Sequence, residues 1–254
     1  MGSVVNYAAV SGNAPLAETL VFATAKVCPE NDVWLDSRGA LWHPGSRWLA
    51  VADLHYGYEL TMRRAGGLFP QWGMGDIRAR LQALIRHYQP EKLILAGDVM
   101  DSSGSAEETL TLLAALQPQV PTLICLEGNH ERPALLKRWT FQRWHREDGG
   151  YLFHHGHNPQ EVLDCPEATA GATVQITGHW HPAVTLNDGA GTSMKLPALI
   201  QQRPRSRRTL SVHHHHWILP AFSPWARGGR LPAPAENVRQ ETWACHQRRV
   251  FAVG

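Results

Sequence analysis

Short apolar runs recur along residues 47–181, and each ends in polar or charged side chains. Such runs predict buried strands, which we expect at residues 47–57, 92–100, 121–126, 150–157 and 173–181. Residues 76–89 have the apolar spacing of an amphipathic helix, and residues 105–117 begin with a helix-capping pattern. Strands that alternate with helices in this way predict a layered α/β domain.

The two predicted helices carry end signals in the sequence. The apolar face of the first helix consists of Ile77, Leu81, Leu84, Ile85 and Tyr88. Asp76 is the expected N-cap of this helix, and Pro90 is the expected stop signal. Ser105 and Glu108 lie three residues apart, which is the spacing of a capping box at the start of the second helix.

The C-terminal third of the chain has a different pattern. We expect a hairpin at 32–44, strands at 193–202, 209–222 and 248–254, and a Pro- and Gly-rich loop at 223–237. Because strands follow one another here without helices, at least one sheet is expected to be mixed. We expect one domain over residues 1–254, with a strand and loop portion at 193–254.

Charge and histidine content are unevenly distributed. The formal net charge is only +2, but nine arginines lie between Gln201 and the C-terminus, against Glu236 and Glu241. This basic region fits a phosphate backbone, and it fits a solvated surface equally well. The fifteen histidines gather in a few tight groups, which is a first compositional sign of metal binding.

Neither membrane insertion nor export is indicated. No run of eighteen apolar residues occurs, and residues 1–27 lack the basic start of a signal peptide. Cys28, Cys125, Cys165 and Cys245 are scattered without CxxC spacing. We therefore expect reduced thiols in a cytoplasmic protein, with a disulfide as the alternative.

Five predicted strands end in the residue types that bind metal ions. These residues are Asp53 and His55, Asp98 and Asp101, Asn129 and His130, His154, His155 and His157, and His179 and His181. Functional groups in α/β sheets gather beyond the carboxyl ends of the strands, so the five segments are expected to converge. Any one motif alone is better explained as a polar turn residue.

The residue types indicate which ions the site would hold. Carboxylate, imidazole and amide ligands without a thiolate suit pairs of Mn²⁺, Fe, Zn²⁺ or Ni²⁺ ions and argue against a structural zinc site. We expect two divalent ions, with Mn²⁺ as the first candidate. A carboxylate such as Asp98 can bridge two cations roughly 3.5–4 Å apart, which together can clamp a phosphoryl group.

The motifs D-x-H, G-D-x-x-D, G-N-H-E, H-G and G-H-x-H, in this order over residues 53–181, resemble those of the calcineurin-like metallophosphoesterase superfamily. The resemblance implies a four-layer α-β-β-α sandwich of two mixed sheets with a dinuclear metal centre. It implies one metal bound by Asp53, His55, Asp98 and His181, and another bound by Asp98, Asn129, His155 and His179. It also implies hydrolysis by a metal-activated hydroxide, with His130 protonating the leaving oxygen and the Asp101 carboxylate orienting His130.

Contacts with the substrate are less well defined by the sequence. His155 precedes Gly156 as the H-G motif requires, and strand alternation turns His154 to the opposite face. His157 can contact substrate or cap the following turn. Arg63 and Arg64 can reach a substrate phosphate, or they are an ordinary exposed pair.

A narrower resemblance involves three further segments. "RRAGGLFP" (63–70), "MKLPALI" (194–200) and "WILPAFSPWARGG" (217–229) are similar to the bacterial ligase-associated DNA-damage-response endonucleases, which are related to SbcD nucleases. This resemblance implies a DNA phosphodiester substrate, a role in DNA repair, and association with a DNA ligase and a helicase.

Alternative functions follow from the same residues. The chain can act on small phosphoesters or nucleotides, or it can be a non-catalytic interaction module. A non-catalytic module would have lost ligands or His130, all of which are present. Residues 66–75 are interpreted as a lid or a dimer contact, and His213–His216 as a further metal site or a chance enrichment near a polar rim. The sequence does not predict the oligomeric state.

Overall fold

The structure is a computed structural model, and it describes residues 23–28, 32–205, 212, 215–226, 228–229, 231, 234, 237–246 and 248–253. Several predictions lie outside these residues: residues 209–211 of the predicted 209–222 strand, His213 and His214, and the arginines at 207, 208, 227 and 230.

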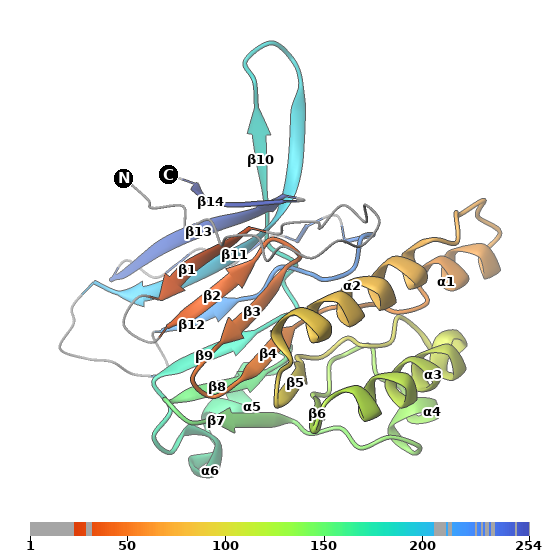
Figure 1. Ribbon diagram of the computed structural model, residues 1–254, viewed down its shortest axis with the longest axis horizontal. Helices are drawn as coiled ribbons and strands as arrows, with labels where there is room; N and C mark the ends of the chain where they lie inside the picture. The colour runs from red at the N-terminus through yellow and green to blue at the C-terminus, as the bar shows by residue number, and fades with distance from the viewer. Residues whose placement is uncertain are drawn as a thin grey trace, which may run out of the picture.

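Two mixed sheets form the centre of the fold (Figure 1). The first has the order β1 (Thr24–Cys28), β2 (Val33–Asp36), β3 (Ala40–His43), β4 (Trp48–Val51), β5 (Lys92–Leu95) and β6 (Thr122–Cys125). The pairs β1–β2, β2–β3 and β3–β4 are antiparallel. The pairs β4–β5 and β5–β6 are parallel. The hairpin predicted at 32–44 is therefore confirmed as β2 and β3.

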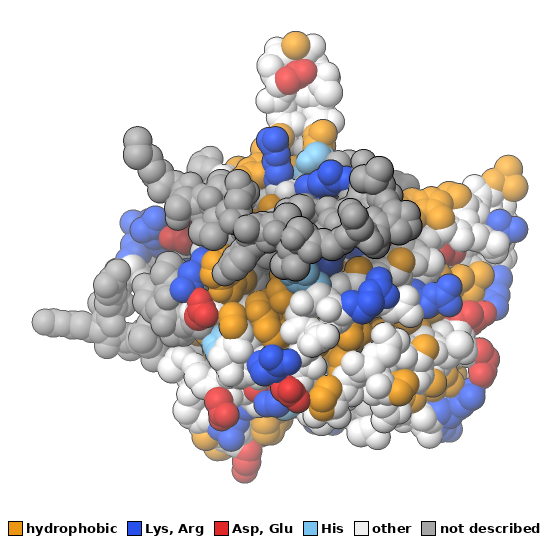
Figure 2. Space-filling model, viewed as in Figure 1, with side chains coloured by type: hydrophobic (Ala, Val, Ile, Leu, Met, Phe, Trp, Pro, Cys, Tyr) orange, Lys and Arg blue, Asp and Glu red, His pale blue; other side chains and the backbone are white. Residues whose placement is uncertain are grey.

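The second sheet is built mainly from the later part of the chain. Its order is β14 (Arg249–Val253), β13 (Val238–His246), β11 (Ser193–Pro204), β12 (His216–Ile218), β9 (Val174–Thr177), β8 (Tyr151–His154) and β7 (Trp144–Glu147). Strands β12, β9 and β8 are parallel, and the other pairs are antiparallel. A hairpin of β10 (Ala183–Asn187) and the start of β11 projects from the body (Figure 1 and Figure 2).

Helices cover the outer faces of both sheets, which confirms the four-layer α-β-β-α sandwich. Helices α1 (Tyr58–Arg64), α2 (Gly73–Tyr88), α3 (Ala106–Leu116) and α4 (Pro133–Leu136) lie on the side of the first sheet. The short helices α5 (Pro159–Leu163) and α6 (Pro166–Thr169) pack on β8 through Val162, Ala168 and Leu152.

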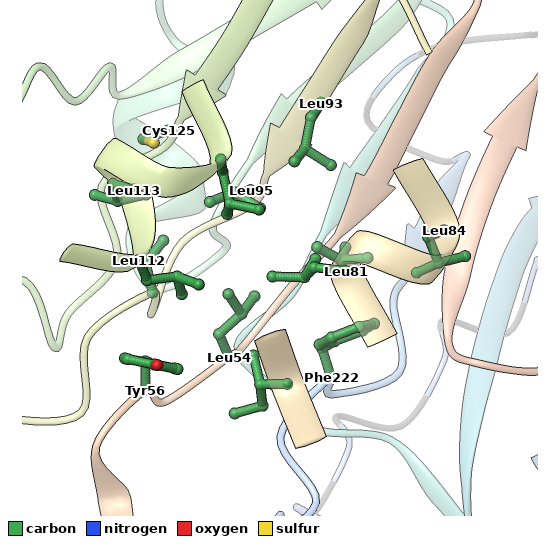
Figure 3. Close-up of a cluster of buried hydrophobic side chains, with 14 of the residues drawn as sticks. Leu54, Tyr56, Leu81, Leu84, Leu93, Leu95, Leu112, Leu113, Cys125 and Phe222 are labelled. Atoms are coloured by element: carbon green, nitrogen blue, oxygen red, sulfur yellow. The ribbon is translucent and has the colours of Figure 1, made fainter. Parts of the chain in front are cut away.

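Alternate residues of the central strands divide between two hydrophobic cores. Leu49 and Val51 of β4 face the helices, whereas Trp48 and Ala50 face the second sheet. Figure 3 shows the core between the first sheet and helices α2 and α3. A strand buried on both faces must be apolar at every position, which explains the continuous apolar runs in the sequence.

Two predicted helix starts were wrong in detail. Helix α2 begins at Gly73 after Trp72, and Asp76 instead lies in the first turn, where it accepts a hydrogen bond from Arg80 Nε at 2.7 Å. The capping box joins Ser102 and Ser105 around a 3₁₀ turn, rather than Ser105 and Glu108. The apolar face predicted for α2 is confirmed, since Ile77, Leu81, Leu84 and Ile85 are buried and Tyr88 packs against them.

Strand prediction also missed several elements. In the described part of 209–222 only residues 216–218 form a strand, and β13 begins immediately after the predicted 223–237 loop. The sequence reading did not identify β1, β7, β10, β13 or α1. Cys125, Cys165 and Cys245 are free thiols. None of the helices in the described ranges has the length and hydropathy needed to span a membrane.

Candidate metal centre

The predicted ligands meet at one edge of the sandwich because they follow parallel strands. Asp53, Asp98 and Asn129 come after β4, β5 and β6 of the first sheet. His155 and His179 come after β8 and β9 of the second sheet, which are also parallel. The carboxyl ends of these strands therefore place residues from five segments next to one another.

The side chains form two groups that share one carboxylate. Asp53, His55, Asp98 and His181 each offer a ligand atom, and these atoms lie within 4.8 Å of one another. Asp98, His155 and His179 form a second group under the same criterion. Asp98 Oδ2 lies 3.7 Å from His55 Nε2 and 3.2 Å from His155 Nε2, so one oxygen faces both groups.

Asn129 joins the second group through its side chain. Its amide oxygen lies 3.2 Å from His155 Nε2, and His155 Nδ1 lies 3.0 Å from the carbonyl oxygen of Ala96. The Ala96 carbonyl oxygen accepts a hydrogen bond from the Nδ1–H group, so Nε2 is the ring nitrogen that faces the cluster. Six of the seven predicted ligands thus have a polar side-chain contact with another predicted ligand: Asp53, His55, Asp98, Asn129, His155 and His181.

Backbone strain is concentrated at this cluster. Asp53, His55, Asp98, His179 and His181 all have φ between 43° and 70°, although none is glycine. Such left-handed conformations cost free energy for residues with a side chain and persist where the surroundings demand them. Their concentration at the ends of three segments indicates that the fold is built to present these side chains.

Glu131 is a structural element of the site that sequence reasoning missed. Its buried carboxylate accepts the backbone N–H groups of Val99 at 2.7 Å, Met100 at 3.1 Å and Gly128 at 2.7 Å. Burial, reinforced by the nearby charge of Asp98, raises the pKa of Glu131. Glu131 thereby clamps the loop after β5 to the loop after β6. The sequence signal was its place in "GNHE" after a strand.

His130 lies beside the cluster, but its contact with Asp101 differs from the expected one. His130 Nδ1 lies 2.7 Å from the backbone carbonyl oxygen of Asp101, not from its carboxylate. That carboxylate accepts a hydrogen bond from Thr61 Oγ1 at 2.6 Å and lies 3.6 Å from His55 Nδ1. The difference arises because the turn after β5 directs the Asp101 carbonyl toward the loop after β6.

The electrostatics of the cluster favour a cation. Asp53 and Asp98 are buried, and within the described residues neither carboxylate pairs with a lysine or an arginine. Burial disfavours protonation of His155, but the hydrogen bond to Asp98 and the charge of Asp53 outweigh burial and raise its pKa to about 9. Buried carboxylates need a compensating charge, and divalent cations suit this donor set. The residues present therefore fit the metal ions that the sequence predicts.

His154 and His157 differ from their neighbour His155. His154 Nε2 contacts Gln175 Oε1 at 3.1 Å, away from the cluster, and burial lowers its pKa to about 4. His157 Nδ1 is buried without a hydrogen-bond partner. Its ring lines a cavity of about 260 Å³ beside His155, together with Glu127, Arg143, Asn158 and Glu161. The prediction that His154 faces away from the cluster is confirmed.

The predicted basic contacts lie apart from the ligand cluster. Arg63 and Arg64 are exposed and donate to the carbonyl oxygens of Phe69 and Gly104, respectively. In the C-terminal region, Arg203 donates to the Val27 carbonyl oxygen at 3.0 Å, which links β11 to β1. The described part of the histidine run contacts Thr177, whose hydroxyl lies 2.8 Å from His216 Nε2, and does not join the ligand cluster.

Comparisons with known proteins show the fold and the family of this chain. A nuclease of Pseudomonas putida, MPE, aligns over 91% of this chain and 100% of its own, at 20% identity and a TM-score of 0.60. Yfce, a phosphoesterase from E. coli, aligns over 81% of this chain and 97% of its own, at 15% identity and a TM-score of 0.45. No curated protein matches the sequence. Residues 46–239 match the calcineurin-like phosphoesterase family (Metallophos), and the chain belongs to that family, whose members are metal-dependent phosphoester hydrolases.

Proposed function

We propose that this protein is a nuclease that hydrolyses DNA phosphodiester bonds with two divalent metal ions, Mn²⁺ being the preferred ion. The observation that carries the proposal is the pair of ligand groups that share Asp98. One metal would be held by Asp53, His55, Asp98 and His181, and the other by Asp98, Asn129, His155 and His179. When bound, the ions supply Lewis acidity toward the phosphoryl group and activate a water molecule.

The protein's own residues would orient the substrate and handle the proton of the leaving group. His130 is held by the Asp101 carbonyl through Nδ1, so its Nε2 is available to the leaving oxygen. His157 and the adjacent cavity would contact the nucleotide beyond His155. The exposed, positively charged side chains of Arg63 and Arg64 would attract the phosphate backbone outside the ligand cluster.

DNA is the proposed substrate for two reasons. The fold aligns with the Pseudomonas putida nuclease over nearly the whole chain. The segments at 63–70, 194–200 and 217–229 resemble those of ligase-associated endonucleases, so a role in DNA repair beside a DNA ligase and a helicase belongs to the proposal. We propose further that residues 1–254 form one domain in the cytoplasm.

The test is an assay after chelation and re-addition of Mn²⁺. The substrates are bis(p-nitrophenyl) phosphate, p-nitrophenyl phosphate and single-stranded DNA. Cleavage of the diester and of DNA, but not of the monoester, is the expected result. Monoester hydrolysis without DNA cleavage would overturn the nuclease proposal in favour of a small-molecule phosphatase. An Asp98→Ala protein purified in parallel controls for a contaminating nuclease.

A further inference from the structure

Four aromatic side chains from distant parts of the sequence gather beside the metal centre. Phe69 and Trp72 come from the connection between α1 and α2, Tyr58 begins α1, and Trp225 follows β12. The ring centroid of Trp225 lies 4.5 Å from that of Trp72, 4.7 Å from that of Phe69 and 6.4 Å from that of Tyr58. We call these four residues the aromatic cluster.

The aromatic cluster is attached to the backbone that carries the ligands. The Tyr58 N–H donates to the His55 carbonyl oxygen at 3.1 Å, and the Ser223 N–H donates to the Asp53 carbonyl oxygen at 3.0 Å. Two residues beyond Ser223, the Trp225 N–H donates to its hydroxyl at 3.3 Å. The cluster therefore borders the side of the metal centre that Asp53 and His55 form.

A buried carboxylate holds the cluster in place. Glu59 is fully buried; it accepts the Trp225 indole N–H at 3.0 Å and the Met74 backbone N–H at 2.7 Å. A Cβ atom at Gly73 would lie 2.1 Å from the indole nitrogen, so Trp225 packs directly on the start of α2. A ring fixed in this way loses little conformational freedom when a ligand stacks on it.

Part of the cluster faces solvent and has positive charge beside it. Trp72 is 50% exposed and Leu68, at the tip of the connection, is fully exposed. Figure 2 shows hydrophobic and basic side chains on the projection at the right, where Figure 1 places the connection between α1 and α2. Within the described residues, Arg63 and Arg64 donate only to carbonyl oxygens and form no ion pair, so their charges are not neutralised by a carboxylate.

We propose that the aromatic cluster stacks against the unpaired bases of a single-stranded nucleic acid whose scissile phosphate lies at the metal centre. This inference rests on the proposed nuclease function and specifies the strand and its point of contact. Aromatic rings interleaved with basic side chains bind single strands by stacking and by charge, with little dependence on sequence. A duplex keeps its bases stacked inside, so these rings would have no exposed base face to bind.

A single strand fits the surface better than a second copy of this chain does. Arg63, which donates to the Phe69 carbonyl oxygen of the cluster, would repel the same residue on a copy docked face to face, but it attracts phosphates. Only the seven-residue helix α1 separates the connection from the segment that carries Asp53 and His55.

The first experiment uses the wild-type protein in EDTA, which prevents cleavage. Binding of an oligothymidylate about 12 nucleotides long is compared with binding of an abasic strand of equal length. Both strands carry the same phosphates. Stacking predicts that the strand with bases binds about 5- to 100-fold more tightly and quenches tryptophan fluorescence. Equal affinities would overturn the inference.

The second experiment uses the exposed ring of the cluster. Trp72→Ala should weaken binding of the strand with bases about 5- to 100-fold while affinity for the abasic strand is kept. Trp72 makes no side-chain capping bond to α2, so this change does not remove a cap. Trp72→Phe should restore part of the affinity. Met194→Ala, a matched change of an exposed apolar residue on the β11 hairpin, should leave binding unchanged.

The outcomes separate this inference from the function on which it rests. If the wild-type protein neither binds nor cleaves DNA, the proposed nuclease function fails. If it cleaves single-stranded DNA but Trp72→Ala binds as tightly as the wild type, only the stacking site is overturned. If sedimentation shows a wild-type dimer that dissociates in Trp72→Ala and Leu68→Ala while DNA affinity is unchanged, the surface is a self-association face instead.

Discussion

His130 donates its backbone N–H to Oδ1 of Asp98 at 2.9 Å. This hydrogen bond orients the carboxylate that both ligand groups share, because it engages one oxygen and leaves Oδ2 to face His55 and His155. The residue proposed to protonate the leaving group is thus tied through its own backbone to the residue proposed to bridge the metals. The metal-binding role of Asp98 and the proton-transfer role of His130 can be measured separately, by metal content and by cleavage rate.

Asp98→Ala should abolish metal binding at both positions. Asp98 is the residue that the Asp53, His55, Asp98 and His181 group shares with the Asp98, His155 and His179 group, so its loss removes a ligand from each. Metal content measured by mass spectrometry after dialysis against Mn²⁺ checks this expectation. Asp148→Ala removes an exposed carboxylate away from the site and should keep the full content. Retention of two full-occupancy ions in Asp98→Ala would contradict a bridging role.

His130→Ala should keep both metals and lower DNA cleavage by two or more orders of magnitude, as expected for the loss of a general acid. The loss should be much smaller with bis(p-nitrophenyl) phosphate, because p-nitrophenolate leaves without a proton whereas a deoxyribose oxygen does not. Steady-state rates on both substrates, with metal content measured alongside, provide the comparison. An equal loss of rate on both substrates would show that His130 does not act by transferring a proton to the leaving group.

Gly128→Ala should weaken metal binding by steric displacement alone. A Cβ atom at Gly128 would lie 2.3 Å from Asp98 Oδ1 and 2.5 Å from the Asp98 nitrogen, so the shared carboxylate must move. Losses of this kind around a metal site are about 10- to 100-fold in affinity. Calorimetric titration with Mn²⁺ measures the effect.

Gly75→Ala is the matched control for this change. Gly75 lies in α2 with no atom within 4 Å of an added Cβ, so the substitution should be neutral for metal and should stabilise the helix by up to about 1 kcal/mol. If Gly128→Ala bound Mn²⁺ as tightly as Gly75→Ala, the close approach of the two loops would not matter for the site.

Glu147→Gln should destabilise the protein in a pH-dependent manner. Glu147 of β7 contacts Lys92 Nζ of β5 at 2.7 Å and His145 Nε2 at 2.8 Å, and so joins the two sheets. Burial raises the pKa of Glu147, but the hydrogen bonds from His145 and Lys92 outweigh burial and hold it below its ordinary value of 4.5. The folded state therefore favours the carboxylate, which stabilises the protein above the unfolded pKa and ceases to do so as pH falls through the folded pKa.

Urea denaturation of chelated protein measures this contribution. The free energy of unfolding of Glu147→Gln should be lower than that of the wild type by about 1–3 kcal/mol at neutral pH, and the difference should shrink below about pH 4.5. Glu91→Gln, which removes an exposed ion pair with Arg47, should cost less than about 1 kcal/mol. A difference for Glu147→Gln that is constant with pH would show that the carboxylate charge does not contribute.

The sequence by itself determined which residues gather at the site. Asp53, Asp98, Asn129, His155 and His179 each follow an apolar run long enough for one buried strand, and parallel strands bring such ends together in any α/β sheet. The buried apolar face of α2 was equally predictable from the sequence, because helical spacing depends only on neighbours three and four residues apart. The family motifs added the order in which the ligands occur.

The contacts that hold and extend the site were decided by the tertiary structure. Whether Asp101 offers its carboxylate or its carbonyl to His130 depends on the turn after β5, and turn geometry is not encoded by residue type alone. Glu131 reaches backbone N–H groups more than thirty positions earlier in the chain. The rings of Trp72 and Trp225 pack against each other at an interplanar angle of 47°, although most of the chain separates them. Such contacts depend on how the sheets and connections pack, because local spacing carries no information about partners distant in sequence.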